Sequence, residues 1–133
     1  MTGWTRTVTL PAVTRTDLVR YAGASGDLNP IHHDDDYAKA AGAGGVFAMG
    51  MYPVGVAARV IADVFGHDSI RQFRARFEQR VWPGDRLVID VRQVDRADGV
   101  RRLELDIWRA EGSRAARCWA SVIDDTEKED THA

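Results

Sequence analysis

The sequence predicts an α+β domain in which one long apolar helix is wrapped by a curved antiparallel β-sheet. Helical patterns fill the first half of the chain and strand patterns fill the second half. The helix pattern before Gly66 has a wide apolar face, which must be covered on most of its sides. Short turns containing glycine separate the strand patterns, so neighbouring strands run antiparallel.

The chain begins with a strand pattern over Thr5–Leu10, which Pro11 ends. Thr14 or Thr16 can then cap a short helix, and we expect that helix to end near Gly23. Its apolar or aromatic positions are Leu18, Val19, Tyr21 and Ala22.

The next segment, Ser25–His33, is predicted to be an ordered loop because Gly26, Asn29 and Pro30 favour turns. Asp34–Asp36 follow at the position where a second helix would begin, and their charge suits a helix N-terminus. Gly42 is a plausible end for that helix.

The stretch Ala40–Ala58 contains no charged residue and is about long enough to span a bilayer. It also holds five glycines and Pro53, and it has few large aliphatic side chains to favour insertion. We therefore expect it to lie in the protein core and predict no membrane association. A central helix is predicted after it from the spacing of Val54, Ala57, Ala58, Ile61, Ala62 and Phe65.

Four further strands are predicted in the second half, over residues 70–81, 87–92, 103–108 and 117–123. The clearest alternation places Leu103, Leu105 and Ile107 on one face. Pro83-Gly84-Asp85, Asp98-Gly99 and Glu111-Gly112-Ser113 are the predicted turns.

Length and composition indicate one domain over residues 1–124, followed by a polar tail, residues 125–133, that we expect to fray. The 18 basic residues nearly balance 20 acidic ones, which argues against a nucleic-acid partner. Cys118 is the only cysteine, which excludes an internal disulfide and a thiolate-built zinc site and is compatible with a reducing compartment. The start of the chain does not resemble a secretory signal, and we expect a cytoplasmic protein.

The segment Tyr21–Tyr37 contains a carboxylate, Asp27, and an imidazole, His32, in a loop shaped by glycine and proline. Such a loop could bring both side chains to one point, where they could hold a water and exchange protons with a substrate. The alternative is that Asp27 forms a local turn, Asp34 caps a helix and His32 is simply packed. The spacing by itself favours this second interpretation.

Other chemistry is less well supported by the residues. Consecutive residues such as His32–Asp36 seldom point at one centre, so we predict no metal site. Ser25 lacks the sequence pattern of an activated serine, and Cys118 falls in a probable core strand. The arginines Arg71, Arg74, Arg76 and Arg80 either meet phosphates or form a solvated strand face.

The run YAGASGDLNPIHHDDDYAKAAG, followed by Ala48-Met49-Gly50-Met51, resembles the MaoC-like hydratase/dehydratase family, which includes the R-specific enoyl-CoA hydratases. The segment from Phe77 to Asp85 agrees with the family layout as well. The resemblance is specific enough to favour the catalytic interpretation of the loop. It also implies the hot-dog fold, a long central helix wrapped by a curved antiparallel sheet.

The resemblance implies that Asp27 and His32 are the catalytic pair and that Gly50 supplies an oxyanion-stabilising N–H. Asn29 and Pro30 would shape the loop. Two departures concern the acyl pocket and the catalytic water: Met49 replaces a usual histidine, and Ala58 stands where some hydratases have a serine.

The implied activity is reversible hydration of trans-2-enoyl thioesters, or dehydration of (R)-3-hydroxyacyl thioesters, of CoA or acyl carrier protein, without metal or redox cofactor. This chemistry belongs to fatty acid or polyketide metabolism. An accessory subunit that completes the acyl tunnel of a second hot-dog chain and a hot-dog thioesterase are the alternatives. A single sheet leaves an open edge, so we expect a homodimer or a heterodimer with another hot-dog chain.

Overall fold

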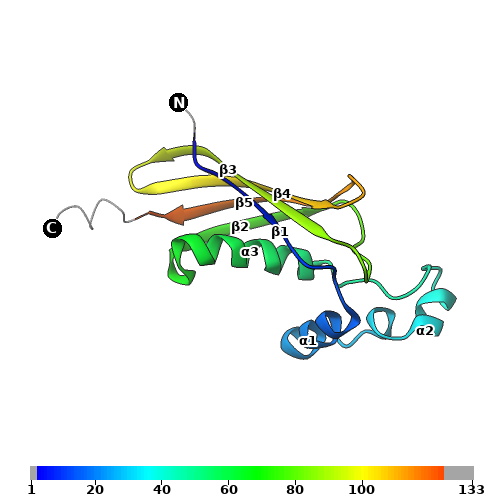
Figure 1. Cartoon of the computed structure of the whole chain (residues 1–133). Coiled ribbons are helices and arrows are strands. Elements are labelled where there is room, and N and C mark those ends of the chain that lie inside the picture. The colour runs from blue at the N-terminus through cyan, green and yellow to red at the C-terminus, as the bar shows by residue number, and fades with distance from the viewer. Residues whose placement is uncertain (1–2, 125–133) are drawn as a thin grey trace.

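The computed structural model describes residues 3–124, and the predicted polar tail over residues 125–133 lies outside the described residues. One five-stranded sheet contains every strand within residues 3–124, in the order β1-β3-β4-β5-β2, and all neighbours pair antiparallel (Figure 1). The strands are β1 (Thr5–Thr9), β2 (Ile70–Phe77), β3 (Leu87–Ala97), β4 (Val100–Arg109) and β5 (Arg114–Ile123). The α+β class predicted from the sequence is confirmed.

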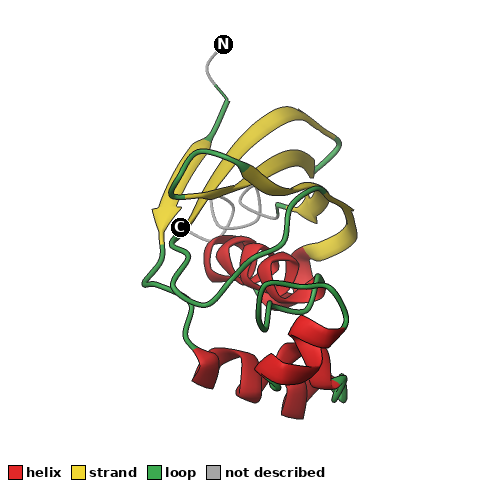
Figure 2. Cartoon of the chain, turned by 90° about the vertical axis from the view of Figure 1, so that its right-hand side faces the viewer, coloured by secondary structure: helices red, strands yellow, loops and turns green. Residues whose placement is uncertain are grey.

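The central helix is α3 (Met51–Phe65), and the sheet curves over it (Figures 1 and 2). Its buried face carries Val54, Ala57 and Ile61, which join the core formed by the inward side chains of the sheet. These inward residues include Leu87, Ile89, Val91, Leu103, Leu105, Ile107, Ala116, Cys118 and Val122. No helix within residues 3–124 is long and apolar enough to cross a membrane.

The remaining helices are α1 (Arg15–Ser25), the 3₁₀ turn η1 (Pro30–His32), α2 (Asp35–Ala40) and the 3₁₀ turn η2 (His67–Ser69). All of the helices lie on the same side of the sheet, and α1 and α2 sit beyond the end of α3 that begins at Met51 (Figures 1 and 2). The loop that carries Asp27 and His32 connects α1 to α2 and is therefore held beside the first turn of α3.

Several predicted boundaries are wrong. Three strands are longer than predicted, since β3 continues to Ala97, β4 begins at Val100 and β5 begins at Arg114. Backbone hydrogen bonds explain two further errors, at the ends of α1 and β2. Helix α1 continues past Gly23 to Ser25, because Gly26 adopts the left-handed φ of 77° and donates its N–H to Ala22 as the C-cap. Strand β2 ends at Phe77 rather than Val81. The N–H groups of the next two residues, 78 and 79, both donate to the carbonyl of Ala115.

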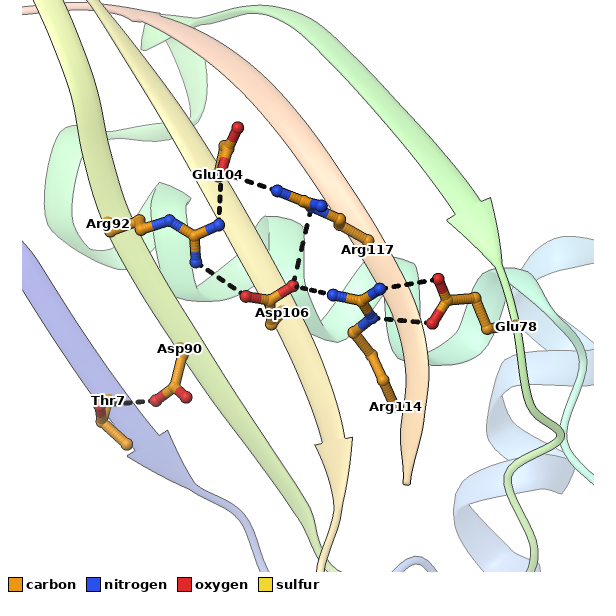
Figure 3. Close-up of polar contacts among 8 residues, drawn as sticks. All are labelled: Thr7, Glu78, Asp90, Arg92, Glu104, Asp106, Arg114 and Arg117. Atoms are coloured by element: carbon orange, nitrogen blue, oxygen red, sulfur yellow. Dashed lines mark hydrogen bonds and ion pairs between the residues drawn. The ribbon is translucent and has the colours of Figure 1, made fainter. Parts of the chain in front are cut away.

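The face of the sheet that points away from α3 carries a network of charged side chains (Figure 3). Asp106 is buried and accepts hydrogen bonds from Arg92 at 2.8 Å and from Arg114 at 3.1 Å. Glu104 pairs with Arg92 and Arg117. Interleaved charges of both signs therefore cover this outer face.

Candidate active site

The loop between α1 and α2 is folded by hydrogen bonds from its own backbone to its own side chains. Ser25 Oγ accepts from the Asp27 N–H at 3.2 Å, and Asp27 Oδ1 accepts from the Asn29 N–H at 3.4 Å. Asn29 Oδ1 in turn accepts from the Ile31 N–H at 3.1 Å and caps the turn that begins at Pro30. This succession of turns brings His32 back towards Asp27.

The imidazole of His32 is held from its Nδ1 side by the chain just before α3. Nδ1 lies 2.7 Å from the carbonyl oxygen of Phe47, and a carbonyl can only accept a hydrogen bond. Nδ1 therefore carries a proton, and in the neutral ring Nε2 keeps its lone pair. The Phe47 ring also packs edge-on against the imidazole, with ring centroids 5.2 Å apart.

Nε2 of His32 faces the carboxylate of Asp27 at a distance of 3.7 Å from Oδ2. This separation is too long for a direct hydrogen bond, but one water can lie about 2.8 Å from both atoms. The two oxygens of Asp27 thus have different surroundings, because Oδ1 accepts within the turn while Oδ2 faces the imidazole. The Asp27 side chain is 44% exposed and that of His32 is 10% exposed, so the pair sits at the edge of solvent.

Asp27 and Gly50 line one pocket of about 340 Å³. Its other lining residues are Tyr21, Ser25, Met49, Met51 and Phe77. Gly50 is the N-cap of α3, where no side chain caps the helix. A backbone N–H at such a helix end can stabilise negative charge.

A second pocket of about 190 Å³ adjoins the first and shares Met49, Gly50 and Phe77 with it. Its walls include apolar residues of the core, among them Pro53, Val81 and Ala115. The two pockets therefore meet at these three shared residues, and the second is also lined by the polar residues Glu78, Gln79 and Arg80.

The other residues of the acidic segment point in separate directions. His33 Nε2 lies 3.4 Å from the carbonyl oxygen of Leu28, and Asp34 caps α2 by accepting from the Tyr37 N–H at 3.1 Å. No three metal-ligating side chains gather anywhere in the described part of the chain. Cys118 is buried in β5, and burial raises the pKa of its thiol to about 11.

Sequence reasoning assigned no role beside the Asp27–His32 loop to four residues that complete this region: Asp35, Phe47, Phe77 and Arg80. The Arg80 guanidinium lies 4.2 Å from the centre of the Phe47 ring. The Phe77 ring covers Gly50 so closely that a Cβ there would lie 3.4 Å from it. These contacts join segments that are far apart in the sequence, so no local sequence pattern predicted them.

The family profile described as MaoC like domain matches residues 5–106. The chain belongs to the MaoC-like dehydratase family. Membership confirms the family resemblance of the Asp27–His32 segment.

Similar curated proteins include the fatty acid synthase beta subunit pigK of Monascus ruber, with 33% identity over 100 residues. This match covers 73% of the chain but only 5% of the fungal subunit. The peroxisomal multifunctional enzyme type 2 of Mus musculus is 36% identical over 66 residues, covering 47% of the chain and 9% of the mouse protein. The chain therefore spans a small part of the length of these relatives.

Solved structures with the same fold include the unliganded R-hydratase PhaJ1 of Pseudomonas aeruginosa, with a TM-score of 0.85 and 23% identity. That superposition covers 93% of the chain and 81% of PhaJ1. The ChsH1-ChsH2 complex of Mycobacterium tuberculosis gives a TM-score of 0.83 at 20% identity, covering 93% of this chain and 98% of that one. The predicted hot-dog fold is confirmed.

Proposed function

We propose that this chain catalyses the reversible hydration of trans-2-enoyl thioesters, and the reverse dehydration of (R)-3-hydroxyacyl thioesters, of CoA or acyl carrier protein. The observation that carries the proposal is the arrangement of His32, whose Nδ1 is bound to the Phe47 carbonyl while Nε2 faces Asp27 at 3.7 Å. Membership in a dehydratase family supports the same reaction class.

Asp27 and His32 would hold the reacting water between them. As the water oxygen bonds to the β-carbon of the enoyl group, Nε2 accepts one of its protons as general base. The Asp27 carboxylate accepts a hydrogen bond from the second O–H and stabilises the imidazolium that forms. The proton on Nε2 is then delivered to the α-carbon, so that one water is added overall and both side chains regain their starting states.

Negative charge develops on the thioester oxygen when the β-carbon is attacked. We assign its stabilisation to the Gly50 N–H at the start of α3, because Gly50 lines the same pocket as Asp27. A backbone donor needs no reorganisation during the reaction, and the helix dipole adds to its effect. Asn29 and Pro30 act by shaping the loop that carries the pair.

The acyl chain of the substrate would occupy the two adjoining pockets beside Gly50. Met49, 2% exposed, lines both pockets and gives this space a flexible hydrocarbon wall in place of an imidazole. Ala58 lies half-buried within α3 and supplies no hydroxyl for the catalytic water. We propose that the acyl group is a hydrocarbon chain, as in fatty acid or polyketide metabolism.

A second candidate function is that of an accessory chain which completes the acyl tunnel of another hot-dog protein. The similarity to one chain of the ChsH1-ChsH2 complex favours it, because that structure contains two different proteins. In either case we propose that the chain works in the cytoplasm as a homodimer or heterodimer, without a metal or redox cofactor, a membrane or nucleic acid.

The test is incubation of the purified protein alone with crotonyl-CoA and longer trans-2-enoyl thioesters, followed by chiral analysis of the products. Formation of (R)-3-hydroxyacyl thioester by the isolated chain supports the hydratase. Hydration that starts only when a second hot-dog protein is added supports the accessory function instead.

A further inference from the structure

We propose that Asp35 is a positioning residue that orients the imidazole of His32 by holding the backbone segment to which His32 is bonded. The importance of Asp35 for turnover rests on the proposed function. The effect of Asp35 on the orientation of the imidazole is independent of that function and can be measured separately.

Asp35 lies in the first turn of α2, and its two oxygens contact two other segments of the chain. Oδ1 accepts the Val46 N–H at 3.0 Å, and Oδ2 accepts from the Arg15 guanidinium of α1 at 2.9 Å. The backbone hydrogen bond from Val46 lowers the pKa of Asp35, and the Arg15 hydrogen bond adds to this effect although burial opposes it. The carboxylate therefore ties the segment before α3 to both α1 and α2.

The residue after Val46 is Phe47, whose carbonyl oxygen accepts the Nδ1–H of His32. One peptide unit therefore lies between the Val46 nitrogen, which donates to Asp35, and the Phe47 carbonyl oxygen, which accepts from His32. Val46 is also buried with Ala38 and Ala43 in a small cluster apart from the main core. The segment is thus held on two sides of the Phe47 carbonyl. The Ala48 N–H, in the same peptide unit as that carbonyl, donates to the Val81 carbonyl at 2.8 Å, and the Val46 N–H on the other side donates to Asp35.

Gly45 provides independent support, because its missing side chain leaves room for the carboxylate. A Cβ at Gly45 would lie 3.3 Å from Asp35 Oδ1, closer than most such contacts, whereas a Cβ at Gly44 would meet nothing within 4 Å. Of these two adjacent glycines, only Gly45 lies against the Asp35 carboxylate. Substitution of Gly44 is therefore a matched control for substitution of Gly45.

Loss of the Asp35 acceptor leaves the Val46 N–H without this partner, so the Val46 side of the segment can shift while the Ala48 N–H stays bonded to Val81. The Phe47 carbonyl then selects the Nδ1–H form less strongly, and a neutral imidazole can exchange between its two tautomers. In the other tautomer Nε2 carries the proton and cannot accept one from water.

The test is ¹⁵N NMR of histidine-labelled protein, which identifies the protonated nitrogen of His32 in the neutral ring. We expect a dominant Nδ1–H tautomer in the wild type and in Asp35→Asn, which keeps a carbonyl oxygen as acceptor. Asp35→Leu should give a mixture of tautomers and should lower kcat on the order of tenfold or more, with KM little changed. Asp36→Leu is the control, since it removes an exposed carboxylate from the same helix turn.

Gly45→Ala and Gly44→Ala decide the question if Asp35→Leu fails to fold. The Gly45 variant should shift the tautomer in the same direction as Asp35→Leu, and the Gly44 variant should match the wild type. A folded Asp35→Leu protein with an unchanged His32 tautomer overturns the proposal, as does an equal shift in Asp36→Leu. A wild-type chain with no hydratase activity contradicts the proposed function only, because the tautomer measurement needs no substrate.

Discussion

His32 Nδ1 lies 2.7 Å from the carbonyl oxygen of Phe47, and this contact determines which imidazole nitrogen is free to react. The backbone acceptor fixes the proton on Nδ1, so the neutral ring presents the Nε2 lone pair to the Asp27 side of the loop. The sequence allowed this side chain to be merely packed, but the contact fixes its orientation, and the proposed proton transfer uses its Nε2.

The assembly state can be tested from the exposed edge of the sheet. Strand β2 pairs only with β5 in the described structure, and Phe77 at its end is 55% exposed beside Met51, another exposed apolar residue. We expect this edge to be covered in a dimer with a shared sheet, because open edges and apolar patches favour association. Sedimentation should show the dimer, and Phe77→Asp should weaken it. A stable wild-type monomer at micromolar concentration would count against the dimer.

Replacing Met49 with histidine should change substrate preference. Met49 lines both pockets beside Gly50, so an imidazole would make the acyl space more polar and narrower. We expect the wild type to prefer long or bulky enoyl thioesters and the Met49→His variant to shift the ratio of turnover towards short ones.

Melting temperature provides the control for this variant. Because Met49 is almost fully buried, a purely structural role would instead appear as a loss of stability from a buried imidazole without a partner. A well-folded variant with an unchanged chain-length profile would show that Met49 does not select the substrate.

From the ion pairs of the charged outer face we predict that the stability of the protein depends on pH. Burial opposes ionisation of Glu104, but hydrogen bonds from Arg117 and Arg92 outweigh it and lower the pKa of this carboxyl below its ordinary value. A lowered folded-state pKa stabilises the protein at pH values above the unfolded-state pKa, and this stabilisation is lost as the pH falls through the folded-state pKa.

Glu104→Gln should therefore reduce the free energy of unfolding by about 1 kcal/mol near neutral pH. The difference from the wild type should shrink between neutral and acidic pH, as the pH falls through the lowered folded-state pKa and the wild-type side chain becomes neutral as well. Urea unfolding at neutral and at acidic pH measures this, with Asp63→Asn as an exposed control that should change little. A difference that is equal at both pH values would contradict the ionic explanation.

The sheet and the central helix were predictable because their signals are periodic. Leu103, Leu105 and Ile107 all face the core as the alternation predicted, and Asp98-Gly99 forms the predicted turn with positive φ at both residues. The error at the end of α1 had a local cause, because Gly23 and Gly26 were both possible stops and only the backbone conformation distinguished them.

The loop of the candidate site was harder to interpret from sequence, because Asp27 serves the turn and also faces His32. The two interpretations that the sequence left open involve different oxygens of one carboxylate. The contacts of Asp35 with Val46 and of His32 with Phe47 span 11 and 15 residues, respectively, with no periodic pattern to reveal them. Such long loop contacts require the folded chain.

The rate of crotonyl-CoA hydration by the wild type, Asp27→Asn and His32→Ala, measured side by side, tests the central claim most directly. Each substitution should lower kcat about a hundredfold or more, the scale of positioned acid–base catalysis, while circular dichroism shows an unchanged fold. Near-normal turnover in either folded variant would contradict the assignment of Asp27 and His32 as the pair that activates water.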